Sequence, residues 1–434
     1  MFVSGFFRRC IQVIFSLITL VLCVPLHGAG LNSIIINALE LDPRILSAQA
    51  EIRASQSEAD GAYSAYYPVI KGNASYGSVE NDNPLQNDGD KRVYGLELAQ
   101  PLPFFGRESA SIDIVKTEVL LRKIELERVR QSVFFEVLET AITLRAKLSI
   151  LRLRELMVDN LLSQVEHLKD SVAGGGAKMN EYYLAQSEWI QMQVLKAQAQ
   201  TDHIAALEKL RSLAPGVTVE REFMAADPST LGLPVIPREY DQALSDSLTK
   251  STLLLSAGYA LEKAQAELAF ARVDVRPRLS LNYSIQQGTF GEFSADTSSV
   301  VLNLNVPIFE GGSSTAQMAT KRHRVEAERE KLDQQRRLHN QQLKEIWSRW
   351  KSAIRMEPVL KTAKKQVQEI VAAIQVQLTS GASTVLVELS ARLTVNETEL
   401  IEINHGLQKD QAFVQLLHQM GYLVLIDDFA LPDA

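Results

Sequence analysis

The stretch VFFEVLETAITLRAKLSILRLRELMVDNLLSQVEHLKDSV, residues 133–172, decides the fold. Its apolar side chains recur every seven positions in two rows, the second of which is interrupted by Glu155. The rows are Val137, Leu144, Leu151, Val158, Val165 and Val172, and Phe134, Ala141, Leu148 and Leu162. Such a seam predicts a coiled coil. The helical pattern begins near Glu108 and meets no Pro or Gly, and about 65 residues at about 1.5 Å each span on the order of 100 Å.

The first 29 residues predict a secretory signal peptide. Two arginines form a short positive start, residues 11–24 are a largely apolar run, and small residues at 28–30 suit cleavage. A transmembrane anchor is the alternative, but a spanning helix needs roughly twenty apolar residues. Pro25 ends the apolar run before that length is reached.

Cysteine content and charge narrow the class of protein further. The only cysteines, Cys10 and Cys23, lie in the predicted signal, so the mature chain has no thiol, which suits an oxidising compartment. Lipid attachment at Cys23 would want a small residue before it, and Leu22 argues against that. Removing the two arginines of the signal takes the formal charge from −7 to −9. A mildly acidic chain without a basic block offers no electrostatic basis for binding nucleic acid.

After the signal, helical patterns over 31–66 give way to residues that alternate between apolar and polar. One face carries Ile70, Ala74 and Tyr76, and the other carries Lys71, Asn73 and Ser75. A polar loop over 80–91 follows, and the alternation resumes from Tyr94, which predicts a β-hairpin over 69–101. Such a hairpin is typical of a membrane β-barrel, and equally of a soluble hairpin covered on one side.

The long helix forms the first arm of a helical hairpin predicted over 108–213. It is interrupted at Gly174-Gly175-Gly176, because glycine readily leaves the helical conformation. A second helical pattern runs from Ala177 to Leu213, where Ala214-Pro215-Gly216 ends it.

The second half of the chain repeats this order. Helices are predicted over 240–273, a β-hairpin with a polar loop at 287–297 over 278–308, and a helical hairpin over 313–420 that is broken at Gly381. Corresponding landmarks lie 209, 206, 206 and 205 residues apart: Pro68 and Pro277, Pro101 and Pro307, Gly106 and Gly312, and Gly176 and Gly381. A regular offset indicates a duplication. We therefore expect a first repeat over 30–225, a second over 226–425 and a tail over 426–434.

Four strands in one chain cannot close a barrel, and lipid does not tolerate an open sheet edge. Several chains would therefore have to share one barrel. The helices indicate the same, because their apolar stripes are narrow and segments such as 321–337 are densely charged. A hollow, water-filled tube of helices fits this composition better than a solid bundle.

In this combination of signal, duplication, Pro–strand–loop–strand–Pro pattern and glycine-tipped helical hairpins, the chain resembles the TolC-like outer-membrane channel family. The resemblance covers essentially the whole mature chain. It implies a mainly α fold with a membrane β part: a homotrimer in which four strands per chain form a shared 12-stranded β-barrel. The helices would continue as a coiled-coil α-barrel through the periplasm.

The same resemblance implies a passive export duct in the outer membrane, extending into the periplasm and serving a tripartite efflux pump or a type I secretion system. Its partners would be a periplasmic adaptor protein, an inner-membrane RND-type pump or ABC transporter, and outer-membrane lipid. The stretch 101–107 is reminiscent of metal-efflux members, whereas 307–312 occurs across the family. Drugs, metal ions and a secreted protein all remain open as substrates.

By position, the resemblance places the adaptor-binding periplasmic tips at 172–180 and 379–385. The residues concerned are Gly174, Gly175, Gly176, Ala177, Lys178, Gly381, Ala382, Ser383, Thr384 and Val385. The glycines also serve simply as helix caps. Glu181 and Glu388 are the candidates for an acidic pore gate, against the alternative that an exposed Glu in an early helical turn only complements the helix dipole.

Pro358 lies within the second long helix, where it removes a backbone hydrogen bond and predicts a kink. We expect no cofactor and no enzyme activity, because the histidines show no metal-ligand spacing and there is no P-loop. The histidines considered are His167, His203, His323, His339, His405 and His418. The other functions weighed are a periplasmic adaptor, which would have one coiled-coil hairpin between compact β domains, and a purely structural coiled coil.

Overall fold

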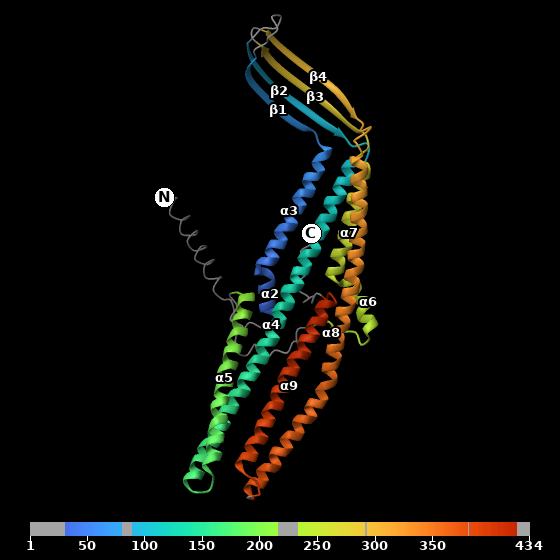
Figure 1. The fold of residues 1–434 in the computed structure, drawn as a ribbon. Coiled ribbons are helices and arrows are strands. Elements are labelled where there is room, and N and C mark those ends of the chain that lie inside the picture. Colours follow the sequence, from blue (N-terminus) through green and yellow to red (C-terminus); the bar gives the residue numbers. More distant parts are fainter. Residues whose placement is uncertain (1–30, 80–88, 216–232, 291–292, 381, 423–434) are drawn as a thin grey trace, which may run out of the picture.

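The computed structural model describes residues 31–79, 89–215, 233–290, 293–380 and 382–422. A sheet lies at one end, and long helices run away from it (Figure 1). The elements in order are α2 (Leu31–Leu41), α3 (Pro43–Tyr63), the 3-10 turn η1 (Ser64–Tyr66), β1 (Val69–Val79), β2 (Gly89–Leu102), α4 (Arg107–Ala173), α5 (Met179–Leu213), α6 (Tyr240–Lys250), α7 (Thr252–Val273), β3 (Arg278–Phe290), β4 (Phe293–Asn305), α8 (Ser313–Thr379) and α9 (Val385–Gln419). The predicted signal and tail lie outside the described residues.

The helix bounds confirm the duplication. Helices α4 and α8 both have 67 residues, and α5 and α9 both have 35. Each helix of the second hairpin begins and ends 206 residues after its counterpart, whereas α7 begins 209 residues after α3. This register corrects one expectation, because position 381 corresponds to Gly175 rather than to Gly176.

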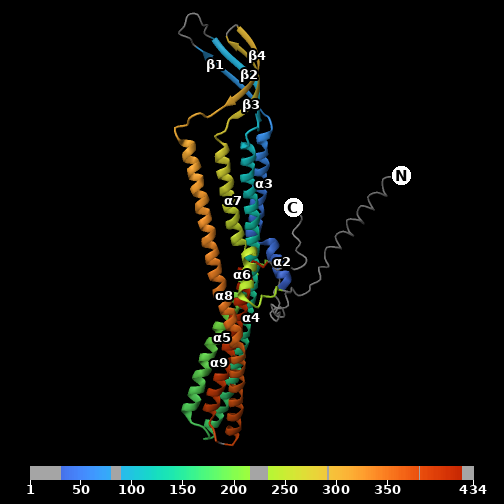
Figure 2. The ribbon, with the colours of Figure 1, turned by 90° about the vertical axis from the view of Figure 1, so that its right-hand side faces the viewer.

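Helix α4 is the axis of the fold, as its heptad rows predict. It packs on α3 and α7 in the part nearer the sheet and on α5 and α9 farther away, as Figures 1 and 2 show. The row from Val137 to Val165 is buried, but the prediction for Leu162 is wrong, since that side chain is 38% exposed. Leu161 and Leu168 are buried instead, because α4 has neighbours on two sides.

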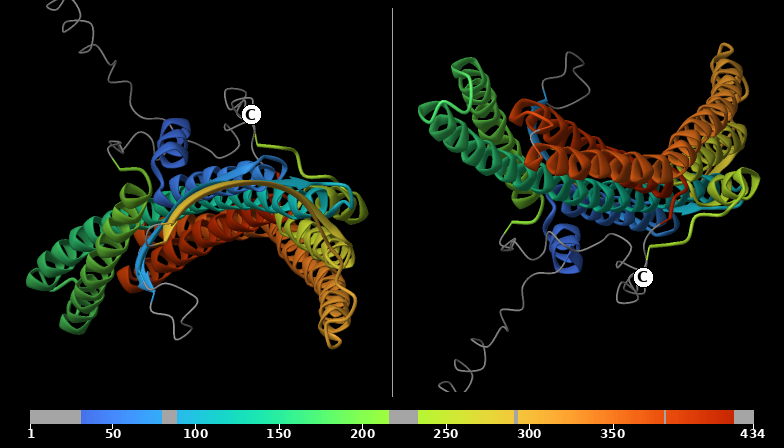
Figure 3. Two further views of the ribbon diagram at one scale, coloured as in Figure 1. Left: turned by 90° about the horizontal axis from the view of Figure 1, so that it is seen from above. Right: turned by 90° about the horizontal axis from the view of Figure 1, so that it is seen from below.

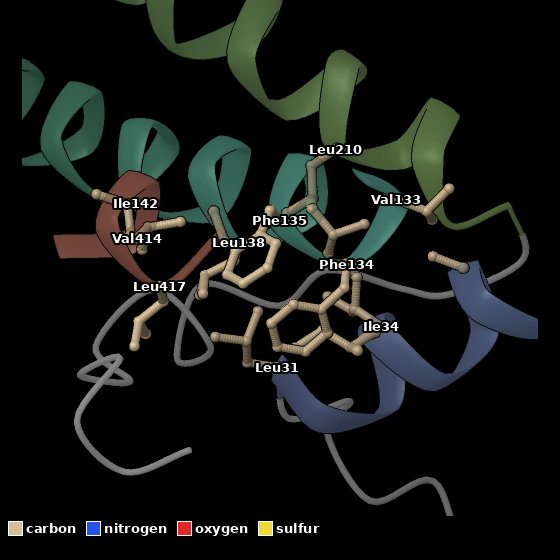
Figure 4. Packing of buried hydrophobic residues seen from close by; sticks show 14 of the residues in the cluster. Leu31, Ile34, Val133, Phe134, Phe135, Leu138, Ile142, Leu210, Val414 and Leu417 are labelled. Carbon is tan, nitrogen blue, oxygen red and sulfur yellow. The ribbon is translucent and has the colours of Figure 1, made fainter. Parts of the chain in front are cut away.

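The main core lies at mid-length, where the helix pairs change partners. Leu138 and Leu144 of α4 are fully buried there, together with apolar side chains of α2, α5, α6, α8 and α9. Figure 4 shows Ile34, Leu210 and Leu417, three members of this cluster that come from three different helices. This core fixes the point at which α5 and α9 end.

The four strands form one antiparallel sheet in the order β1-β2-β3-β4. Paired residues line up across the four strands. One such row is Ile70, Leu98, Tyr283 and Val300, and the next row is Lys71, Glu97, Ser284 and Ser299. The predicted alternation of faces is therefore confirmed. The strands are longer than expected, since β2 begins at Gly89 and β3 and β4 remain paired as far as Phe290 and Phe293. The backbone ladder continues past the last apolar side chains because it does not depend on them.

Helix α8 is continuous through Pro358. The carbonyl of Pro358 accepts a hydrogen bond from the Thr362 hydroxyl at 2.9 Å. The kink stays a prediction. Within the described ranges, none of the helices is long and apolar enough to cross a membrane.

Candidate functional site: the hairpin ends and the two-faced sheet

The two helical hairpins end side by side, at the end of the molecule opposite the sheet (Figures 1 and 2). A second hydrophobic cluster joins them, with Leu161 and Leu168 of α4, Ala185 of α5 and Leu389 of α9. Ala177 and Val385, one from each predicted tip, are partly buried against this cluster. The structure therefore brings the two predicted tips together at one end.

The first hairpin end is shaped by Gly175, whose φ of 80° lies in the left-handed region that favours glycine. The backbone N–H of Gly175 donates to Val172 O at 3.0 Å, and that of Gly176 donates to Ser171 O at 2.8 Å. This pair of bonds is a Schellman motif, which caps the carbonyls at the end of α4. Lys178 is exposed and is the N-cap residue of α5.

The second hairpin end has the same plan but a stronger start to its second helix. The Ala382 N–H donates to Gln377 O at 2.9 Å, which matches the Gly176 bond of the first end. Thr384 caps α9, its hydroxyl accepting from the Val387 N–H at 3.4 Å. Ser383 is half-buried, Ala382 and Thr384 are exposed, and Gly381 lies outside the described residues.

The two predicted gate residues differ in their surroundings. Glu388 is not an exposed carboxylate: it is 9% exposed and accepts two hydrogen bonds from Arg392, at 2.9 and 2.7 Å. Glu181 is half-buried and accepts from the Lys178 N–H at 3.4 Å. With the 206-residue offset, Glu388 corresponds to Tyr182, so the two carboxylates are not equivalent positions.

A pocket of mixed polar and apolar lining lies beside Arg392. It measures about 170 Å³ and is bounded by α4, α8 and α9, with Arg392, Asn160, Gln164 and Gln368 among its polar lining residues and Met157, Leu161 and Leu389 among its apolar ones. Gln375 of α8 also reaches toward Glu388, at 3.5 Å. The sequence interpretation missed Arg392, although its four-residue spacing from Glu388 is that of a helical ion pair.

The sheet presents a large apolar face beside a polar one. The apolar face is uncovered in the single chain, with Ile70 67%, Leu96 59%, Val300 68% and Leu302 61% exposed. The opposite face carries Lys71 beside Glu97, and Ser284 hydrogen-bonds Ser299 at 2.9 Å. An exposed apolar patch of this kind marks a surface that meets lipid or another protein.

Comparison with known proteins settles the family. The family model described as outer membrane efflux protein matches residues 34–216 and 243–422, one match for each repeat. The chain belongs to the outer membrane efflux protein family. It is thus an outer-membrane protein that extends into the periplasm and serves as a duct for efflux or secretion.

Two curated relatives are similar over most of their length. The alkaline protease secretion protein AprF of Pseudomonas aeruginosa is 24% identical over 364 residues, covering 77% of this chain and 74% of AprF. The outer membrane efflux protein BepC of Brucella suis is 23% identical over 366 residues, covering 80% of this chain and 76% of BepC.

Solved structures share the fold of this outer membrane efflux protein. The structure of CusC aligns with a TM-score of 0.81 at 16% identity, covering 91% of this chain and 92% of CusC. The outer-membrane channel OprN aligns with a TM-score of 0.77 at 17% identity, covering 90% and 89% of the two chains. The predicted TolC-like fold, with two repeats and four strands in each chain, is confirmed.

Proposed function

We propose that three copies of this chain assemble into one passive export duct across the outer membrane and periplasm. The observation that carries this proposal is that the described part of the protomer has two edges, in the sheet and among the helices, without a neighbouring element. In the sheet the edges are β1 and β4. Among the helices, α8 lies at one edge, and α3 and α5 lie at the other. Seen along its length, the protomer is an open arc (Figure 3).

The two-faced sheet supports the same assembly. Three copies of the four-stranded sheet would give a closed barrel of twelve strands, which removes every open edge. The apolar face with Leu96 and Val300 would meet lipid, and the face with Lys71 and Glu97 would line a water-filled interior. The helices would continue this interior into the periplasm.

The hairpin ends are the surface we propose for a periplasmic adaptor. Both ends are exposed, lie together and hold rigid caps. Such a duct carries no enzyme activity, so energy would come from an inner-membrane pump of the RND type or an ABC transporter. The relatives carry names of both kinds, a protease secretion protein and an efflux protein. The substrate is therefore proposed only as a drug, a metal ion or a secreted protein.

The assembly is tested on protein purified in detergent from outer membranes. We expect a native mass of three chains, a band that shifts on heating before electrophoresis, and discrete conductance steps in planar bilayers. A monomer in native mass spectrometry, or a trimer that leaves bilayers non-conducting under every voltage tested, would overturn the duct.

The Glu388–Arg392 pair is expected to set cation preference at the hairpin ends. Glu388→Ala should reduce the preference for K⁺ over Cl⁻, because the carboxylate is lost and Arg392 is left without this partner. Arg392→Ala should increase the preference for K⁺, because it leaves the same carboxylate unpaired. Reversal potentials under a KCl gradient measure both effects. Glu181→Ala tests the other gate candidate in the same measurement, and unchanged reversal potentials in the Glu388 and Arg392 variants would rule out a gate role for Glu388.

A further inference from the structure

Four helices lie side by side in the half of the molecule next to the sheet. Helix α3 packs on α4, α4 on α7, and α7 on α8. Figure 2 shows this row below the strands. Within the described residues, α3 and the first half of α8 are thus the end members, and each keeps one side without a helical neighbour.

The joint between α4 and α7 lies within one protomer, and the structure describes the residues on both of its sides. Glu118 of α4 accepts from Lys263 of α7 at 2.7 Å. Near the sheet, the Arg107 guanidinium donates to Asp274 at 2.6 Å, and near the core Thr252 donates to Gln131 at 3.1 Å. These three contacts fix the register of two antiparallel helices.

The duplication maps this internal joint onto the two free edges. Adding 206 to α4 gives α8, and subtracting 209 from α7 gives α3. The positions of α7 on the α4 side are half-buried: Ser256, Tyr259, Lys263, Ala266 and Phe270. Their counterparts in α3 are all exposed: Ser47, Ala50, Ala54, Ser57 and Gly61. Helices α4 and α8 differ in the same way. Four half-buried positions of α4 are Ile114, Glu118, Leu121 and Glu125, and their counterparts in α8 are all exposed: Thr320, Arg324, Ala327 and Lys331.

We propose that these two exposed faces pack on each other between neighbouring copies, in the register of the internal joint. This inference rests on the trimer proposed above and names the contact that closes it. Glu118 and Lys263 correspond to Arg324 and Ala54, so Arg324 of one copy lies beside Ala54 of the next. Arg324 is 61% exposed and lies 3.8 Å from Glu267 of its own chain. Because Ala54 is small, the guanidinium can also reach the carboxylates one turn away on either side, Glu51 and Glu58.

The charges of the two faces are complementary. Residues 313–338 of α8 carry seven Lys or Arg and four Asp or Glu. On α3, Glu51, Arg53, Glu58 and Asp60 are exposed, and Glu51 lies 3.9 Å from Arg122 of its own chain. Arg44 already binds Asp42 and Glu136 of its own chain, both at 2.8 Å. Apart from Arg44, the exposed charged side chains of α3 are therefore three acidic ones and one basic one. A second copy of this chain therefore fits both faces better than a partner of uniform charge.

The strands give a separate check of the register. Leu98 of β2 pairs with Tyr283 of β3, and the same offsets pair Leu304 of β4 with Ala74 of the next copy. In this register Leu302 faces Tyr76 on the apolar side, and Asn303 faces Ser75 on the polar side. A slip of one residue would put apolar against polar side chains along the whole strand.

Cysteine cross-linking tests the joint directly, because the only natural cysteines lie at positions 10 and 23. We expect a short bis-maleimide to link the double variant Ala54→Cys, Arg324→Cys into covalent dimers and trimers. The variant Glu118→Cys, Lys263→Cys is the internal control. The reagent should link its two cysteines within one chain, so that both free thiols disappear and no covalent dimer or trimer forms. In Ala54→Cys, Arg322→Cys the second thiol lies on another side of α8, and no link between chains should form.

Native mass of the uncross-linked proteins separates this inference from the proposed trimer. If the trimer forms but chains are linked only in the Ala54→Cys, Arg322→Cys variant, the proposed register of α3 on α8 is wrong and the proposed duct is unaffected. If no variant and no parent protein is a trimer, the proposed function itself fails.

A charge reversal tests the ion pairs of the joint. Arg324→Glu should weaken association about two- to fivefold for each joint, the range of an exposed ion pair. Adding Glu58→Arg to it should restore association toward the parent value. A double variant that is weaker than either single variant would overturn the pairing of these side chains.

Discussion

Replacing Gly421 with alanine is expected to lower the free energy of unfolding by about 2–4 kcal/mol. Gly421 follows the end of α9 with a φ of 70°, a conformation that alanine adopts only with strain. A Cβ atom built there would lie 2.3 Å from the Lys250 carbonyl oxygen and 2.9 Å from the Ser251 nitrogen. Both are backbone atoms between α6 and α7, so side-chain movement cannot relieve the contact.

The cost should be high because three elements meet at this residue. The Gly421 carbonyl accepts from the buried Gln131 side chain of α4 at 3.3 Å. Next to it, the Tyr422 hydroxyl donates to Asp246 of α6 at 3.1 Å, and Lys250 lies over the Tyr422 ring. Any displacement of Gly421 therefore disturbs the contacts that attach the end of α9 to the middle of the molecule.

Unfolding of purified protein, followed by circular dichroism during a denaturant titration, measures the change. Gly406→Ala is the matched control, because Gly406 lies within α9 and a Cβ atom there would meet nothing within 4 Å. That variant should gain about 0.5–1 kcal/mol from helix propensity. Equal stabilities of the two alanine variants would contradict the close packing of Gly421.

The helical fold could be predicted from the sequence because heptads, glycine turns and the duplication act locally and repeat. The seam from Val137 to Val165 needs only the 3.5-residue period to be recognised. Leu162 was assigned to the wrong side because α4 has neighbours on two sides, and one seam cannot describe a helix with two. The strand ends were set too short because hydrogen-bond ladders continue where the apolar pattern stops.

The candidate site was predictable only in its glycines. The left-handed backbone conformation at position 175 favours glycine, so this turn can be recognised from the sequence. Glu388 was expected to be exposed, and its burial and the pocket beside Arg392 depend on where α4 and α8 lie beside α9. The exposed faces of α3 and α8 could not be recognised from the residue pattern of either helix alone. They emerge only when the buried and exposed copies of one joint are compared.

A pH-dependent loss of stability is expected from His339, which is 1% exposed. It occupies the heptad row of α8 that continues through Ile346 and Ala353. Its Nε2 lies 2.9 Å from the Ser247 hydroxyl, and its Nδ1 lies 3.1 Å from the Gln419 amide nitrogen. The amide donates to Nδ1, so the ring is neutral and carries its proton on Nε2.

The first repeat shows that this polar group is not required by the fold. The positions equivalent to His339, Ser247 and Gln419 are Val133, Ala38 and Leu213, all apolar. Val133 and Ala38 are fully buried. His339→Val thus places at this position the side chain that the first repeat carries at the equivalent position.

The sign of the pH effect follows from burial, which lowers the pKa of His339 below its usual value near 6.5. As pH falls below about 6.5, His339 becomes protonated in the unfolded chain while it stays neutral in the folded chain. The stability is therefore complete above that pH and is lost toward the lower pKa of the folded state, by up to about 1.4 kcal/mol per pH unit. Burial, with Arg128 as a smaller cause, lowers the pKa of His418 as well and acts in the same direction.

Denaturant titrations at pH 7.5, 6.5 and 5.5 should show this difference between parent and variant. The parent protein should lose stability over this range, and His339→Val should lose less, keeping the share that belongs to His418. His323→Gln, at a histidine of α8 that is 75% exposed, is the control for the loss of an imidazole outside this joint. If His339→Val follows the parent profile, protonation of His339 does not limit the stability of this joint. The slope would then have to come from His418 and the carboxylates of the helices.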